Sequence, residues 1–132
     1  MQYFRFSLFA LFAIFISIRD LQTHLIKNRT LILFAICGSF VAYPLRPIWF
    51  VYTTVITLLL HVMARGKIGA GDLKLFWILL IWSKGFDSWL NSFMVSWILG
   101  GLFSIGLWLL RSERKSNIPF APFIFIGFIS AI

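Results

Sequence analysis

Apolar stretches separated by short polar connections follow one another along the whole chain. A bilayer-spanning helix needs about 20 predominantly apolar residues, and several of these stretches approach or reach that length. The pattern predicts helices over residues 4–18, 30–45, 48–63, 71–85, 88–110 and 118–132. The fourth and sixth are short for a span, so the pattern defines their ends least well.

Composition places these helices in a membrane. The chain is 61% hydrophobic and only 12% charged, whereas soluble domains carry about 25% charged residues. The first stretch resembles a signal peptide, but Arg19 and Asp20 follow it in place of a small-residue cleavage pattern. We therefore expect an all-α integral membrane protein, a bundle of six transmembrane helices forming a single domain over residues 1–132.

The net charge of +8 indicates orientation and not nucleic-acid binding, because the basic residues lie scattered in the connections. The positive-inside rule predicts that the more basic side faces the cytoplasm and that both termini lie outside. Nine basic residues fall on one side, against Arg5, Arg46 and Lys84 on the other. The nine are Arg19, Lys27, Arg29, Arg65, Lys67, Lys74, Arg111, Arg114 and Lys115.

The stretch Gly69-Ala70-Gly71-Asp72-Leu73-Lys74 carries one of only four acidic residues in the chain. Its glycines permit backbone conformations closed to other residues, and an ionisable group at the mouth of a membrane helix indicates function. A purely structural alternative is a glycine-rich turn with Asp72 as a helix N-cap.

Asp20 and Asp72 are expected on the same, cytoplasmic side of the bundle. Two carboxylates that come close cannot both ionise easily and share a proton, as in aspartic proteases. The alternative is that Asp20 pairs with Arg19 or Lys27, and Asp72 with Lys74. Asp87 lies on the opposite side, and Glu113 stands among basic residues.

Three stretches resemble the type IV prepilin peptidase family of membrane aspartic proteases, which includes the preflagellin peptidases. Residues 20–29, DLQTHLIKNR, are similar to the family's D-x-x-T-x-x-I-P-N, with Lys27 in place of proline. Residues 69–74, GAGDLK, match G-x-G-D-x-K in full. Residues 118–123, IPFAPF, are similar to I-P-F-G-P-F, with Ala121 in place of glycine.

The resemblance implies an endopeptidase that removes prepilin leaders at the cytoplasmic face of the inner membrane, without metal or cofactor. It implies that Asp20 and Asp72 are catalytic. Its partners would be the apolar helix of a prepilin and the lipid bilayer; the oligomeric state is not indicated. The active-site loop would comprise Gly69, Ala70, Gly71 and Lys74, with support from Thr23, Asn28, Pro119 and Pro122.

Several secondary expectations follow. Lys27 in place of proline is expected to loosen the connection after Asp20, since proline would restrict φ. His24, four residues after Asp20, is a weaker candidate partner for it. Gly100, Gly101 and Gly106 are expected to admit a substrate helix.

The lone Cys37 excludes an internal disulfide and a zinc site. Larger family members carry a C-x-x-C insertion and methylate their products, so we expect a peptidase-only member here.

Two alternatives remain open. One is a G-x-G-D protease of the presenilin kind, which Arg19 before Asp20 disfavours, since those enzymes use Y-D. The other is a catalytically silent multipass membrane subunit.

Overall fold

A computed structural model describes residues 1–65, 68–111 and 120–132, and the regular elements in these ranges are all helical. The all-α prediction is therefore confirmed. The helices are α1 (Gln2–Thr23), α2 (Asn28–Val41), α3 (Pro47–Met63), α4 (Ala70–Trp82), α5 (Phe86–Arg111) and α6 (Ala121–Phe128), followed by the 3₁₀ turn η1 (Ile129–Ala131).

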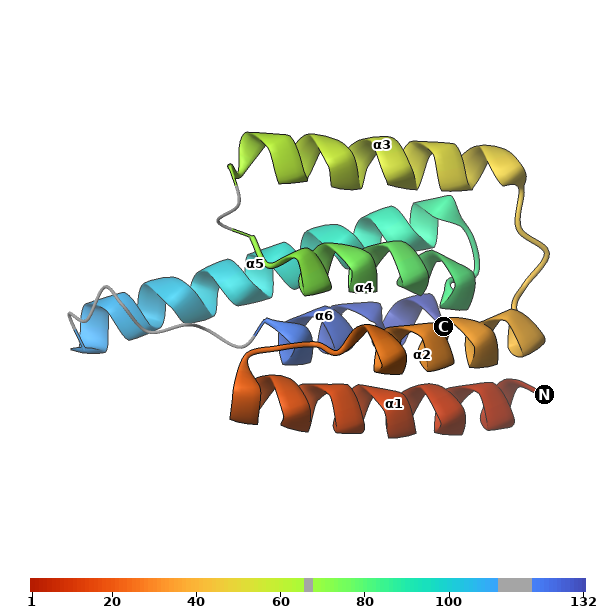
Figure 1. Cartoon of the computed structure of the whole chain (residues 1–132), viewed down its shortest axis with the longest axis horizontal. Coiled ribbons are helices and arrows are strands. Elements are labelled where there is room, and N and C mark those ends of the chain that lie inside the picture. The colour runs from red at the N-terminus through yellow and green to blue at the C-terminus, as the bar shows by residue number, and fades with distance from the viewer. Residues whose placement is uncertain (66–67, 112–119) are drawn as a thin grey trace.

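Successive helices run in alternating directions, so that one end of the bundle collects the end of α1 and the starts of α2, α4 and α6 (Figure 1). We call this the Asp20 end. The short connections between neighbouring helices favour such an up-and-down order. Residues far apart in the sequence thereby meet at the Asp20 end.

Helix α4 lies at the centre of the bundle and is buried on most sides. Its aromatic residues pack against those of neighbouring helices, with the Phe34 and Trp82 rings stacked at a centroid distance of 4.8 Å. Two indole N–H groups also bind backbone carbonyls of other helices, Trp82 that of Phe34 at 3.2 Å and Trp89 that of Phe76 at 2.8 Å. Each such bond contributes about 1 kcal/mol net, so α4 is tied to both α2 and α5.

Arg5 lies within α1, only 5% exposed, and is not a free charge at the bundle's end. Its guanidinium donates to the backbone oxygen of Trp82 at 2.5 Å and lies 3.6 Å from the centroid of the Tyr43 ring. A cation there complements the negative end of the α4 dipole. Arg5 therefore lies at the end of the bundle opposite Asp20.

The helix ends differ from the predicted ones where polar residues continue a helix. Helix α1 runs through Thr23 and not only to residue 18, because Asp20 continues its buried face. Helix α2 already begins at Asn28, and α5 begins at Phe86. Helix α4 ends at Trp82, three residues before the predicted end, since Ser83 adopts an extended conformation. The predicted start of the last helix, at residue 118, lies outside the described residues.

Among the described helices, α5 alone is long and apolar enough over Phe86–Leu110 to cross a membrane by itself. Shorter apolar helices flank it at Asn28–Val41, Pro47–Met63 and Ala121–Ala131.

Candidate active site

Asp20 lies in the last turn of α1, on the face of the helix that packs against the core. Arg5, Phe9, Ile16 and Asp20 are the buried residues of this helix, and their spacing of four, seven and four places them on one face. Asp20 itself is 5% exposed. Its Oδ2 accepts a hydrogen bond of 3.0 Å from the backbone N–H of Ala121, which opens α6.

Asp72 is the third residue of α4 and lies before the apolar stretch that begins at Leu75. It is half-buried. Burial and, secondarily, the charge of Asp20 raise the pKa of Asp72 to about 6. Both aspartates lie at the Asp20 end of the bundle.

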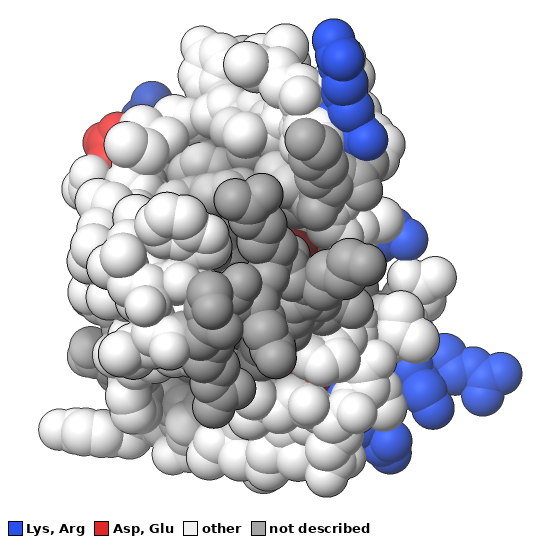
Figure 2. Space-filling view, turned by 90° about the vertical axis from the view of Figure 1, so that its left-hand side faces the viewer, with Lys and Arg blue, Asp and Glu red and all other residues white. Residues whose placement is uncertain are grey.

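Neither carboxylate forms an ion pair within the described ranges. The guanidinium of Arg19 lies 5.6 Å from the centroid of the Phe15 ring, along its own helix. The Lys74 Nζ donates to Asn28 Oδ1 at 3.1 Å. Figure 2 looks onto this end, where Lys and Arg side chains project outward along one side. The alternative in which Asp20 pairs with Arg19 and Asp72 with Lys74 is thus not what the structure contains.

The two glycines of the G-x-G-D stretch are required for space and not for unusual backbone angles. Gly69 is the N-cap of α4 at φ −60°, which any residue adopts. A Cβ on Gly69 would lie 3.2 Å from Asp72 Oδ2, and one on Gly71 would lie 3.2 Å from the Ile26 Cβ. The expectation that Gly69 supplies conformational freedom was wrong. Ala70, between them, is exposed.

Lys74 and Asn28 join the two motif-bearing segments, since their side chains connect the start of α4 to the start of α2. Lys74 therefore has a protein partner in Asn28. A groove of about 460 Å³ between α2 and α4 begins at this pair and continues past Trp77 and Ile78. These residues lie on the side of α4 away from Asp72, so the groove does not open onto the carboxylates.

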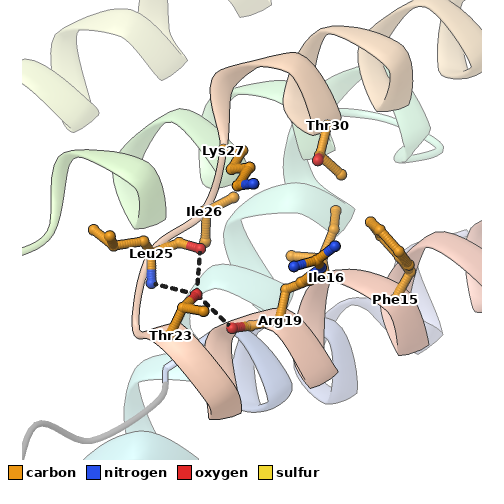
Figure 3. A pocket seen from close by; sticks show the side chains of 8 residues that line it. All are labelled: Phe15, Ile16, Arg19, Thr23, Leu25, Ile26, Lys27 and Thr30. Atoms are coloured by element: carbon orange, nitrogen blue, oxygen red, sulfur yellow. Dashed lines mark hydrogen bonds between the residues drawn. The ribbon is translucent and has the colours of Figure 1, made fainter.

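Thr23 and His24 do not contact Asp20 through their side chains. The Thr23 hydroxyl donates to the Arg19 carbonyl at 2.8 Å and accepts from the Leu25 N–H at 3.4 Å, beside a cavity of about 40 Å³ (Figure 3). His24 is exposed, and its backbone N–H binds the Asp20 carbonyl at 2.9 Å. The structure thus supports Thr23 as a helix-end residue and leaves His24 without a role at the carboxylates.

The third motif contributes through its backbone. Pro122 is half-buried in the first turn of α6, and Pro119 lies outside the described residues. The group that reaches Asp20 is the N–H of Ala121, which sequence reasoning missed because a backbone donor has no side-chain signature. The start of a helix next to Pro122 was the available signal, since the first-turn N–H groups of a helix are free to bind other acceptors.

No cluster of three or more His, Cys, Asp or Glu side chains that could hold a metal occurs in the part of the chain that the structure describes.

The sequence profile of the type IV leader peptidase family matches residues 7–105. The chain belongs to this family. Comparison with curated proteins and with solved structures gave no match. The region matched to the leader peptidase family includes Asp20 and Asp72 and ends before α6.

Proposed function

We propose that this chain is a membrane-embedded aspartic endopeptidase that removes the leader peptide of type IV prepilin-like substrates, with Asp20 and Asp72 as its catalytic pair. The observation that carries the proposal is the placement of these two aspartates at one end of the bundle, Asp20 at the end of α1 and Asp72 at the start of α4. Membership of the leader peptidase family supplies the reaction class.

The pair has the properties that aspartic peptide hydrolysis needs. One carboxylate accepts a proton from water, whose oxygen attacks the scissile carbonyl carbon, while the other, protonated, donates to the carbonyl oxygen. When the C–N bond breaks, the leaving amine takes up the proton that water gave. A shared proton between two close carboxylates prepares both roles at once.

The surface of the bundle supports a location within the bilayer. Large apolar side chains are exposed along α1, α2, α3 and α5, among them Leu58, Val62, Leu102 and Leu109. Monomeric soluble proteins rarely expose contiguous apolar surface on this scale. Only 17% of the most apolar window of α5 is buried, which distinguishes α5 from the core helix of a soluble domain.

We further propose that all six helices cross or enter the membrane with the Asp20 end at the cytoplasmic face and both termini outside. The exposed basic residues Arg19, Lys27, Arg29 and Lys74 lie toward this end and favour that orientation. A prepilin would then present the junction between its polar leader and its apolar helix at the level of the two aspartates. The likeness to a presenilin-type protease is weaker, since the matching family is that of the leader peptidases.

Co-expression with a prepilin, with loss of the leader followed by gel shift, tests the proposal. Wild-type protein is expected to cleave, and Asp20→Asn and Asp72→Asn to lose cleavage at equal membrane abundance. Asp87→Asn is the matched control, because Asp87 is exposed in the first turn of α5, at the opposite end of the bundle. Normal cleavage by either Asp20→Asn or Asp72→Asn would exclude the two-aspartate mechanism.

A further inference from the structure

The start of α6 lies against Asp20. Ala121 is fully buried, and its backbone N–H donates to the Asp20 carboxylate at 3.0 Å. This N–H belongs to the first turn of α6, where it has no acceptor within its own helix. The partial positive charge of the helix N-terminus acts in the same direction as the hydrogen bond. Both interactions favour the ionised form of the acceptor.

Asp72 has no comparable donor. Its carboxylate accepts no hydrogen bond from any residue in the described ranges, although it stands at the start of α4. The space beside its Oδ2 is bounded by Gly69, which has no side chain to donate. The two carboxylates therefore differ in one decisive respect, because only Asp20 is held by a donor from a separate helix.

We infer that the N-terminus of α6 is a positioning element of the active site, whose Ala121 N–H fixes Asp20 as the carboxylate that activates water and leaves Asp72 as the proton donor to the carbonyl oxygen. This inference rests on the proposed peptidase function and assigns the two roles within it. The Asp20 carboxylate takes the proton from the attacking water and delivers it to the leaving amine. Asp72 donates its proton to the carbonyl oxygen and recovers it when that carbonyl reforms.

The other charged groups near this end do not reverse the assignment. At the end of α1 they are Arg19 and His24, at the start of α2 Lys27 and Arg29, after α3 Arg65, and on α4 Lys74. All six are exposed, and none forms an ion pair with either carboxylate within the described ranges. Helix α6 itself, Ala121–Phe128, contains no titratable residue.

Helix α5 holds the start of α6 in place. The ring of Phe120 fills the space beside Gly100, where a Cβ would overlap it. Gly100 therefore serves contact within the bundle, and the expectation that it admits a substrate helix was wrong. Gly101, the next residue of α5, has no atom within 4 Å of the position its Cβ would occupy. Gly100→Ala and Gly101→Ala are thus matched substitutions, of which only the first must displace the ring of Phe120, the residue directly before Ala121.

The test is the pH profile of kcat/KM for leader cleavage by these two variants. Displacing the donor removes a hydrogen bond that favours the ionised carboxylate, so Gly100→Ala is expected to lose activity more steeply at low pH than at neutral pH. Loss of a hydrogen bond to a charged group gives a loss of about tenfold at low pH. Gly101→Ala is expected to keep the wild-type profile. A loss by Gly100→Ala that is equal at every pH, or the same change in Gly101→Ala, would overturn the inference.

Infrared difference spectra of the carboxylic-acid band provide a readout that needs no substrate. At pH 5 the protonated band is expected to disappear in Asp72→Asn and to persist in Asp20→Asn. Loss of the band in Asp20→Asn alone would place the proton on Asp20 and not on Asp72. That result would overturn the inference, even if cleavage depends on both residues. Failure of the wild type to cleave any prepilin would instead contradict the proposed function, whatever the spectra show.

Discussion

At the scale of single residues, Lys27 already has the backbone geometry that the family's proline would impose. It is the N-cap of α2 at φ −71°, within the range of proline, so the expected loosening of this connection is not found. Its carbonyl accepts from Thr30 and Leu31, and its own N–H donates to no described residue. The departure from the family pattern at this position therefore leaves the path between Asp20 and α2 unchanged.

Lys27→Pro is accordingly expected to stabilise the protein by about 0.4–1 kcal/mol, because it restricts the unfolded chain without straining the folded one. Thermal unfolding in detergent, with cleavage as a second readout, would measure this. Thr30→Pro is the matched control, since the Thr30 N–H donates to the Lys27 carbonyl at 3.1 Å and proline removes it. A lower unfolding temperature for Lys27→Pro would contradict the stated geometry.

His24 ends α1 in the left-handed conformation, at φ 52°. This conformation costs a non-glycine residue about 1–2 kcal/mol, and the exposed imidazole offers no contact that offsets it. We expect His24→Gly to raise the free energy of unfolding by about 1 kcal/mol and to leave cleavage within twofold of wild type. Thr23→Gly, one residue earlier and helical, should destabilise instead. Loss of cleavage in His24→Gly would revive a role for the imidazole beside Asp20.

At the scale of helices, α2 and α4 approach each other most closely where Gly38 faces Trp82. A Cβ on Gly38 would lie 2.5 Å from the indole Nε1, which donates to the Phe34 carbonyl. Gly38→Ala is therefore expected to destabilise the bundle by about 1–3 kcal/mol through overpacking. Gly106→Ala, which meets no atom within 4 Å, should instead stabilise α5 by about 0.5–1 kcal/mol.

Chemical or thermal unfolding of the Gly38→Ala and Gly106→Ala variants in the same detergent compares their stabilities. Equal effects of the two substitutions on stability would mean that Trp82 does not pack against Gly38 as described. Helix propensity alone would then determine both changes in stability.

The sequence predicted the helices well because apolar stretches of this length have few other structures available. It predicted their ends less well. Residues 19–23 are polar enough to read as a connection, yet Asp20 continues the buried stripe of Phe9 and Ile16 and so belongs to α1. The sequence signalled a helix start beside Pro122 but not the acceptor of its N–H groups, because any residue except proline supplies the same N–H. Only the packing of α6 shows which carboxylate receives it.

At the scale of the whole molecule, the alternation of helix direction concentrates the chemistry at one end. Asp20 comes from the end of the first helix, Asp72 from the start of the fourth and Ala121 from the start of the sixth. An up-and-down bundle places all three at the same end, while Arg5 ties α1 to the far end of α4. The folded bundle thus holds the two carboxylates at one end. Their mutual repulsion lowers the stability of the bundle.

The burial of Asp72 and, secondarily, its repulsion by Asp20 make the stability of the fold depend on pH. The pKa of Asp72 rises from 3.8 to about 6 on folding, so the folded state binds the proton more tightly than the unfolded state. The resulting stability is fully present below the unfolded pKa of 3.8 and is lost as pH rises through about 6. Above that pH, the ionised Asp72 destabilises the fold relative to an uncharged residue of the same shape.

Asp72→Asn should therefore be more stable than wild type at pH 8, by about 1–3 kcal/mol for a shift of this size, and should show no such gain at pH 4. Unfolding temperatures of the purified protein at the two pH values measure the difference. Asp87→Asn, at the opposite end and exposed, is expected to show no comparable difference between them. If Asp72→Asn were equally stable relative to wild type at both pH values, the Asp72 carboxylate would be neither buried nor held near Asp20 in the resting protein, and substrate would have to assemble the pair.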